Sequence, residues 1–149
     1  MTSKPIVVDC TYNASIERVW EAIVDEKQMP KWFFPTIERF RPEPGFEAQF
    51  TVTTPDGQEF VHLWQVTEVV PSQKIAYRWR YEGIEGDSSV VWELVETTRG
   101  TRLTLTHTGH ETFPQGKHFS REAGEMGWTY FLRESLKEYL DGDTTPVRS

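Results

Sequence analysis

The sequence predicts an α+β domain in which a curved antiparallel sheet of about six strands wraps around a long C-terminal helix, with one or two short helices after the first strand. From about residue 38 to residue 107, apolar and polar residues alternate in short segments, which is typical of half-buried strands. Short turns separate these segments, as they do between antiparallel neighbours. The segment near 121–141 then has helical spacing, and its apolar stripe would cover the apolar face of the sheet.

The first elements are a strand and a short helix. Residues 6–12 alternate as a strand does, which places Cys10 on the buried side. Asn13 or Ser15 offers an N-cap for a helix over about 15–25, whose apolar residues recur at helical spacing. Those residues are Ile16, Val19, Trp20, Ile23 and Val24. An aromatic-rich connection over 29–35 follows, with room for one helical turn.

Five further strands are predicted from alternation and from the turns between them. Their segments are 46–53, 59–69, 75–81, 90–94 and 103–107. Residues 55–57, 71–73 and 97–100 favour tight turns, because Pro presets φ and Gly tolerates positive φ. The Gly-, Asp- and Ser-rich residues 83–89 predict a hairpin loop.

The C-terminal helix has one rotation that gives a continuous buried face. That face consists of Gly124, Trp128, Phe131, Leu132, Ser135, Leu136, Tyr139 and Leu140. The other rotation, through Met126 and Tyr130, is interrupted by Glu134, so we expect Met126 and Tyr130 to face outward. Gly142 predicts the end of the helix, and residues 143–149 predict a frayed tail.

Length and composition describe a single domain over 1–149, with its core at about 6–141. No apolar run is long enough to span a membrane, and no secretory signal precedes the first strand. The single cysteine cannot form an internal disulfide, which fits a cytoplasmic protein. A formal net charge of −7 argues against a nucleic-acid binder, since phosphate neutralisation requires clustered Lys and Arg. Both a monomer and a homodimer are compatible with this composition.

Several segments together resemble one known family. They are Ala14–Trp20 with Lys31-Trp32, Val66–Trp79 with its Pro turn, Gly100–Gly109, and Gly127-Trp128 with Leu132, Leu136 and Leu140. The chain resembles the START-like (SRPBCC) helix-grip superfamily, and within it the branch named for the C-terminal domain of the activator of Hsp-90 ATPase. The resemblance implies a helix-grip, Bet v-like fold with a cavity between the sheet and the C-terminal helix. Members of the superfamily bind lipids, sterols or polyketides, and some are enzymes, so the fold alone does not assign an activity.

The inward face of the predicted sheet is aromatic with polar tips. The candidate ligand-binding residues are Tyr12, His62, Trp64, Tyr77, Trp79, Trp92, His107 and Trp128. Buried Tyr, Trp and His need hydrogen-bond partners, which a ligand in a pocket can supply. A filled core, satisfied by backbone and water, stays open as the alternative. Trp32, Phe33 and Phe34 are expected to be exposed, as a pocket lid or as a dimer contact.

No metal or cofactor is expected, and no catalytic residue is assigned. His107, His110 and Glu111 are close in sequence, but the Thr-Gly pair between the histidines predicts a turn that aims the two rings apart. Ser88 lies in a predicted loop without a nucleophile elbow. Cys10, if buried, behaves as a small apolar group.

Three functions are compatible with these residues and with the resemblance. The preferred one is binding of a small hydrophobic molecule, lipid-like or aromatic, in the cavity without turnover. The second is a chaperone interaction module like the Hsp-90 ATPase activator, which the name of the branch implies. The third is a cyclase- or hydrolase-type enzyme in which His62, Tyr77 or His107 moves protons.

Overall fold

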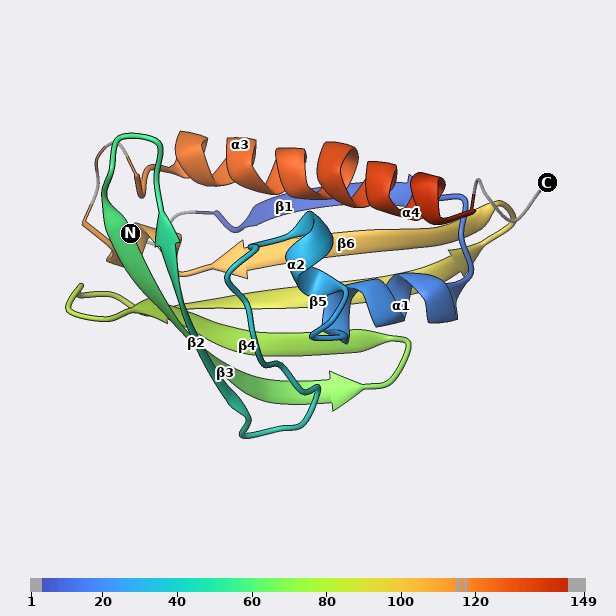
Figure 1. The fold of residues 1–149 in the computed structure, drawn as a ribbon, viewed down its shortest axis with the longest axis horizontal. Coiled ribbons are helices and arrows are strands. Elements are labelled where there is room, and N and C mark those ends of the chain that lie inside the picture. Colours follow the sequence, from blue (N-terminus) through green and yellow to red (C-terminus); the bar gives the residue numbers. More distant parts are fainter. Residues whose placement is uncertain (1–3, 115, 117, 145–149) are drawn as a thin grey trace.

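The computed structural model describes residues 4–114, 116 and 118–144. Its strands are β1 (Ile6–Tyr12), β2 (Glu47–Thr53), β3 (Glu59–Val70), β4 (Lys74–Tyr81), β5 (Ser88–Thr97) and β6 (Gly100–Thr108). They form one antiparallel sheet in the order β1-β6-β5-β4-β3-β2. The sheet curves beneath a long C-terminal helix (Figure 1), so the predicted α+β architecture is confirmed.

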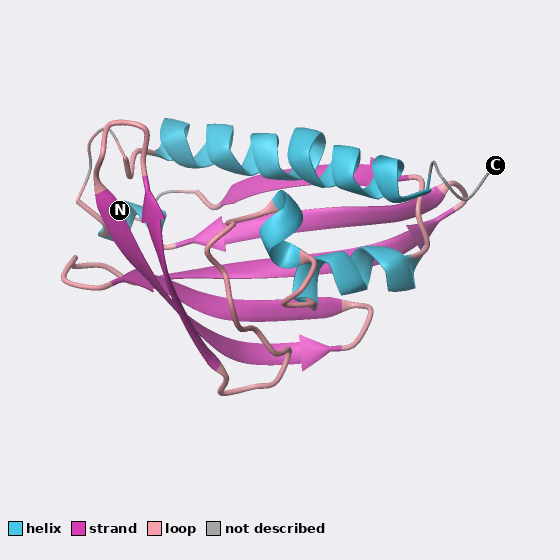
Figure 2. Ribbon diagram, viewed as in Figure 1, coloured by secondary structure: helices cyan, strands magenta, loops and turns pink. Residues whose placement is uncertain are grey.

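The main helices gather on one face of this sheet (Figure 2). They are α1 (Ile16–Val24), α2 (Met29–Trp32) and the C-terminal helix, which comprises α3 (Arg121–Tyr130), the π-helical turn η2 (Phe131–Ser135) and α4 (Leu136–Thr144). A short 3-10 turn, η1 (His110–Thr112), follows β6. Helix α1 begins as predicted, because the Ser15 hydroxyl accepts a hydrogen bond from the Arg18 amide at 3.1 Å. Within the described ranges, no helix is long and apolar enough to cross a membrane.

The C-terminal helix presents the predicted face to the sheet. Its fully buried residues are Trp128, Leu132, Leu136 and Leu140. Met126 and Tyr130, which belong to the rejected rotation, are 67% and 53% exposed. The hydrophobic stripe therefore fixed the rotation of the helix correctly.

The helix widens at η2, and this turn is tied to the first strand. The Leu136 amide donates to the Phe131 carbonyl five residues back. Because a π turn skips one α-helical hydrogen bond, a carbonyl there is free for another donor. The Leu132 carbonyl accepts a hydrogen bond from the Tyr12 hydroxyl at 2.6 Å. Tyr12 thus joins the end of β1 to the middle of the C-terminal helix.

The start of β5 differs from the prediction. The strand begins at Ser88 rather than Val90, so the loop over 83–89 is shorter than expected. The Ser88 hydroxyl donates to the Trp79 carbonyl of β4 at 2.7 Å, and Ser88 is 3% exposed. This contact holds a polar residue in the sheet that local composition assigned to a loop.

Two further expectations were wrong. Helix α4 runs through Gly142 to Thr144, so Gly142 does not end it, and the first two residues of the predicted tail are helical. A glycine costs a helix only about 1 kcal/mol relative to alanine, which neighbouring packing can offset. The rest of the tail, 145–149, lies outside the described residues. Cys10 is partly exposed, because β1 is an edge strand of the sheet.

Candidate ligand-binding site

Rings from three parts of the chain meet between the sheet and the C-terminal helix. We call the following residues the aromatic cluster: Phe33, Phe34, Phe50, His62, Trp64, Tyr77, Trp79, Trp92, Trp128 and Phe131. Neighbouring ring centroids within it lie 4.6–6.5 Å apart, the range in which aromatic pairs attract. Most of the residues predicted from the inward face of the sheet belong to this cluster. His107 borders it, and Tyr12 serves the tie between β1 and the helix instead.

Phe33 occupies the centre of the aromatic cluster. Its ring stacks on Trp32, with centroids 4.9 Å apart and planes at 8°, and lies 5.8 Å from Trp64 at 29°. Trp92 and Phe131 meet it edge-on, at 81° and 87°. Phe33 is 5% exposed and Trp32 is 2% exposed, so the expectation that this stretch is exposed was wrong. The ring is buried because the sheet and the C-terminal helix supply apolar surfaces on several of its sides.

Phe34 stands at the margin of the same cluster. Its ring lies 5.4 Å from Phe50 on β2 and 5.1 Å from Phe131 on the C-terminal helix. Phe34 is only partly buried, unlike Phe33. It therefore closes the space between the edge strand β2 and the helix from the outside.

Of the buried indole N–H groups in the described part of this region, four are hydrogen-bonded to a protein acceptor and one is not. Their bonds are Trp32 to the Ala22 carbonyl (2.7 Å), Trp79 to the Tyr81 hydroxyl (2.8 Å), Trp92 to the Tyr77 hydroxyl (3.0 Å) and Trp128 to His107 Nδ1 (3.2 Å). Trp64 is 2% exposed, and its Nε1–H has no acceptor among the residues that the structure describes. Buried polar groups are nearly always hydrogen-bonded, so this exception needs an explanation.

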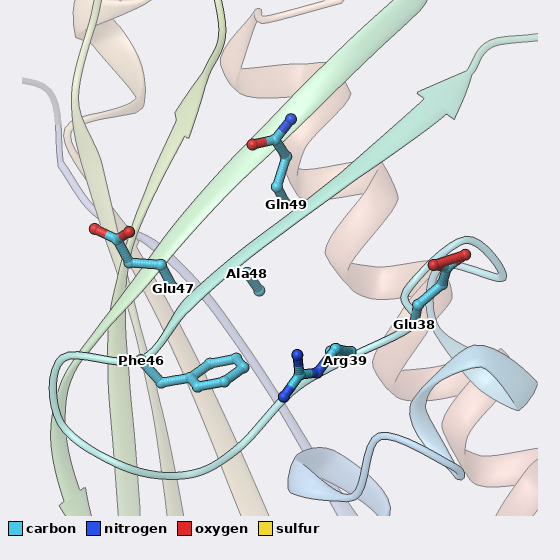
Figure 3. Close-up of a pocket in the computed structure, with 6 residues that line it drawn as sticks. All are labelled: Glu38, Arg39, Phe46, Glu47, Ala48 and Gln49. Carbon is cyan, nitrogen blue, oxygen red and sulfur yellow. The ribbon is translucent and has the colours of Figure 1, made fainter.

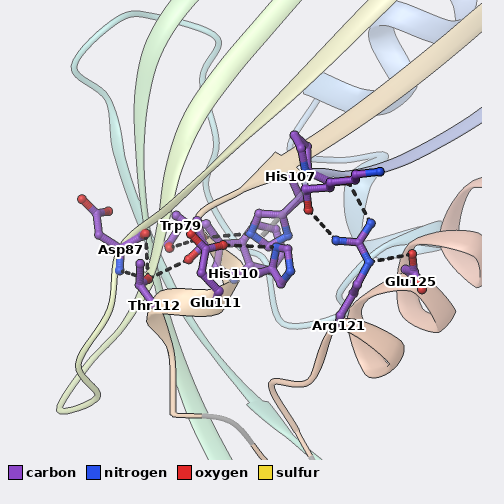
Figure 4. Close-up of polar contacts among 12 residues, drawn as sticks. Trp79, Asp87, His107, His110, Glu111, Thr112, Arg121 and Glu125 are labelled. Atoms are coloured by element: carbon purple, nitrogen blue, oxygen red, sulfur yellow. Dashed lines mark hydrogen bonds and ion pairs between the residues drawn. The ribbon is translucent and has the colours of Figure 1, made fainter. Parts of the chain in front are cut away.

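His107 takes part in a directional chain of hydrogen bonds that leads to the Trp79 backbone; Figure 4 labels these two residues. Its Nδ1 accepts from the Trp128 indole, which leaves the ring proton on Nε2. That N–H donates to Ser88 Oγ at 2.9 Å, and the Ser88 hydroxyl donates to the Trp79 carbonyl. Burial, and secondly the nearby His110, lower the pKa of His107 to about 4. The imidazole is therefore neutral at pH 7.

The neighbouring serine and histidine do not form a nucleophile–base pair. A general base must accept the serine proton, whereas His107 donates its own proton to Ser88. The chain instead holds Trp128 and Trp79 in position. The sequence analysis placed Ser88 in a loop, because its partners lie 9 and 19 residues away and meet it only in the folded sheet.

His62 lies inside the aromatic cluster. Its Nδ1 donates to the Phe60 carbonyl of its own strand at 3.2 Å, and its ring stacks on Phe50 at 4.8 Å. Burial lowers the pKa of His62 to about 4, although the bond to the Phe60 carbonyl acts in the opposite direction. His62 is thus a second buried, neutral imidazole.

The tyrosine hydroxyls stay protonated. Burial raises the pKa of Tyr12 and of Tyr77 above the usual range, and it raises the pKa of Tyr81 to about 12. Acid–base catalysis near pH 7 works best with a group whose pKa is close to 7. The pKa shifts of His62, Tyr77 and His107 all lead away from that value. None of these three groups therefore has a pKa near 7.

The histidines at the end of β6 come together rather than apart. The ring centroids of His107 and His110 are 6.3 Å apart, so the predicted divergence was wrong. Gly109 has φ of 87°, and the 3-10 turn that starts directly after it brings His110 back toward His107. His110 Nδ1 lies 3.8 Å from Glu111 Oε1. Across the described residues, no group of three or more metal-binding side chains gathers.

One open hollow, of about 290 Å³, touches the aromatic cluster, because Trp64 lines it together with residues 47–49, Leu63, Gln65 and Arg80. Others lie away from the cluster. One, of about 250 Å³, lies at the sheet edge between β2 and the α2–β2 connection, and Glu38, Arg39 and residues 46–49 line it (Figure 3). Another, of about 420 Å³, surrounds Met126 and Tyr130 on the outer face of α3. Neither is lined by a residue of the cluster. On the inward face of the sheet, the cluster side chains pack against one another, with Phe33 in the middle.

Solved structures with the same fold cover nearly the whole chain. Protein CV1439 from Chromobacterium violaceum is 21% identical, with a TM-score of 0.76, and the match covers 91% of this chain and 96% of that protein. Mll3558 from Rhizobium loti is 25% identical, with a TM-score of 0.74 and coverage of 92% and 96%. DynU16, from the dynemicin biosynthetic locus, is 21% identical with a TM-score of 0.75, and the match covers 93% of this chain but 48% of DynU16. These neighbours confirm the helix-grip fold. A comparison with curated proteins returned no match.

The family comparison extends over almost all described elements. The model for the activator of Hsp90 ATPase homolog 1-like protein matches residues 13–141, from the residues just before α1 into α4. The match includes the whole aromatic cluster and the His107 hydrogen-bond chain. The resemblance found in the sequence motifs is confirmed. The chain belongs to the family of activator of Hsp90 ATPase homolog 1-like proteins.

Proposed function

We propose that this protein binds a small, uncharged, hydrophobic molecule between the sheet and the C-terminal helix, in the space that the Phe33 ring occupies. The observation that carries the proposal is the position of Phe33. Its ring is surrounded by rings of the sheet and of the helix, yet it belongs to neither element. A side chain carried on a connection can leave this space while the sheet and the helix keep their places.

The attachments of the connection indicate how it would open. Residues 33–46 join α2 to β2 without forming a strand of the sheet. The Trp32 backbone is held by the Ser135 hydroxyl, which donates to its carbonyl at 2.5 Å from within η2. Phe34 spans the gap from β2 to the helix. Outward movement of Phe33 and Phe34 would open a path between that strand and η2.

The chemistry of the cluster favours a neutral guest that is bound and not transformed. His62 and His107 are both uncharged at pH 7. Both ring nitrogens of His107 are bonded, to Ser88 and to Trp128, and His62 Nδ1 donates to the Phe60 carbonyl. A charged ligand would lose its hydration without gaining a counter-charge there. An apolar molecule with few polar atoms matches such a lining.

Titration with the fluorescent probe N-phenyl-naphthylamine tests this function. The wild-type protein is expected to bind it saturably, and Phe33→Ala is expected to bind at least about tenfold more tightly, because no ring then has to be displaced. Phe113→Ala is the matched control, since Phe113 is a Phe of similar burial whose ring packs on Tyr81 and Phe119, which lie outside the cluster. Absence of saturable binding to the wild type, or equal tightening in both variants, would refute the proposal.

Chaperone contact is the second candidate function. The family description supports it, and the exposed Met126 and Tyr130 on α3 offer an apolar surface to a protein partner. If this function holds, the protein raises the ATPase rate of purified Hsp90 in a saturable manner, and a Met126→Ala, Tyr130→Ala double variant loses the effect. An unchanged ATPase rate at saturating protein would rule it out.

A further inference from the structure

We infer that Trp64 is the specificity-determining residue of this site: its indole N–H selects flat, neutral aromatic ligands that carry a hydrogen-bond acceptor, such as a ring ketone or a quinone oxygen. The inference rests on the proposed function and names the ligand class for the same space. Three observations carry it: the unpartnered N–H, the arrangement of rings around Phe33, and the absence of charge in the aromatic cluster.

The first observation is that Trp64 stands apart from its neighbours. Trp32, Trp79, Trp92 and Trp128 each donate to a protein acceptor at 2.7–3.2 Å. Trp64 is as deeply buried as they are, and its N–H has no acceptor among the described residues. Each of these other four indole N–H groups is therefore hydrogen-bonded within the protein, and the Trp64 N–H is left to bond a ligand.

The surroundings of Trp64 explain why the protein itself supplies no acceptor. The rings in contact with it are Phe33, Phe40, Phe50, Tyr77 and Trp79. The Tyr77 hydroxyl already accepts the Trp92 N–H at 3.0 Å. Phe33 is the ring of this set that stands directly after α2, so a guest that replaces it lies against the Trp64 indole.

The second observation is that Phe33 occupies its space as a ligand ring would. One face of the site is Trp64, at 5.8 Å and 29°, and edges of Trp92 and Phe131 close the sides. This geometry suits a planar aromatic ring, which gains both stacking and edge contacts, better than a flexible acyl chain. A flat molecule that replaces Phe33 brings its rim to the neighbourhood of the Trp64 indole.

The third observation limits the kind of acceptor. Among the described residues, no Lys or Arg is buried, and the imidazole inside the aromatic cluster, His62, is held neutral by burial. A carboxylate or phosphate would therefore enter without a counter-ion, at high desolvation cost. A neutral carbonyl oxygen accepts the N–H without that cost.

Fluorenone and fluorene provide a matched pair of probes, since both are flat three-ring molecules and only fluorenone has a carbonyl. Each is titrated by displacement of N-phenyl-naphthylamine from the wild type, from Trp64→Phe and from Trp20→Phe. The measured quantity is the ratio of the dissociation constants of fluorenone and fluorene. The two probes differ in water solubility, but this difference is the same for every variant, so it cancels when the ratios of two variants are compared. We expect Trp64→Phe to shift this ratio about tenfold against fluorenone, the worth of one buried hydrogen bond. Trp20→Phe, which alters an indole of α1 outside the aromatic cluster, is expected to leave it unchanged.

The wild-type protein gives an independent readout that needs no variant. The indole N–H proton resonance of Trp64 is expected to move downfield with fluorenone and to stay near its position with fluorene. An unchanged ratio in Trp64→Phe, or equal resonance shifts with both probes, would overturn the role of Trp64 while leaving the proposed function intact. Binding of N-phenyl-naphthylamine without binding of either probe would overturn the ligand class. Absence of binding of all three molecules to the wild type would refute the proposed function itself, and this inference with it.

Discussion

Acidification from pH 7 to pH 5 is expected to lower the free energy of unfolding by about 4 kcal/mol, about 2 kcal/mol for each of His62 and His107. Folding lowers the pKa of both imidazoles from about 6.5 to about 4, mainly by burial. Between these values the unfolded chain binds more protons than the folded protein, so stability falls as the pH falls. The contribution is complete above pH 6.5 and is lost by about pH 4.

Urea unfolding at a series of pH values measures this loss. A His62→Phe variant, which suits the aromatic surroundings of that position, is expected to lose only about 2 kcal/mol between pH 7 and pH 5. His118→Asn serves as the control, because the His118 side chain is 22% exposed and lies outside the cluster. The interpretation fails if His62→Phe and His118→Asn show the same pH dependence as the wild type.

Trp128→Ala is expected to destabilise the protein by about 4 kcal/mol at pH 7. The indole packs against Phe33, Trp79 and Trp92 with centroids 5.4–5.9 Å away, and it is 5% exposed. Truncation leaves a cavity and also leaves His107 Nδ1 without its donor. The free energy of unfolding from urea titration at constant pH checks the value.

Two further variants separate packing from hydrogen bonding at this position. Trp128→Phe keeps a ring but removes the N–H, so it is expected to cost about 1–3 kcal/mol for the unsatisfied His107 nitrogen. Tyr130→Ala, two residues along the same helix and 53% exposed, is expected to change stability by no more than about 0.5 kcal/mol. Equal losses in Trp128→Ala and Tyr130→Ala would contradict the buried role of the indole.

The sheet and the rotation of the C-terminal helix could be predicted because both depend on local periodicity. The alternation of apolar and polar residues along β2 to β6 indicates which side chains face the core. The apolar stripe through Trp128 and Leu136 indicates which face of the helix is buried. Helix ends are less predictable. Gly142 looked like a stop, yet the helix continues through it, because propensity is a weak determinant beside tertiary packing.

The candidate site was only partly predictable for the same reason. His62, Trp64 and Trp79 were found because they alternate along strands. Phe33 lies in a short aromatic stretch without periodicity. The local sequence therefore does not tell whether its ring is buried at the centre of the cluster, as it is, or exposed on the surface. The unpartnered indole N–H of Trp64 could not be predicted either. Whether a buried donor has an acceptor depends on how the interior packs, and no short segment of the sequence contains that information.

The order of the strands has a consequence for how the chain folds. β1 pairs with β6, so that Ile6 lies opposite His107 in the finished sheet. Contacts between residues so distant in sequence carry a large loop-closure entropy and slow the folding rate, to milliseconds or seconds in proteins dominated by them. During synthesis, β1 can pair only after β6 has emerged from the ribosome. The hydrogen bond from the Tyr12 hydroxyl to the Leu132 carbonyl forms later still, once Leu132 has emerged. The nascent chain therefore needs β1 to stay unpaired and soluble until β6 has been synthesised.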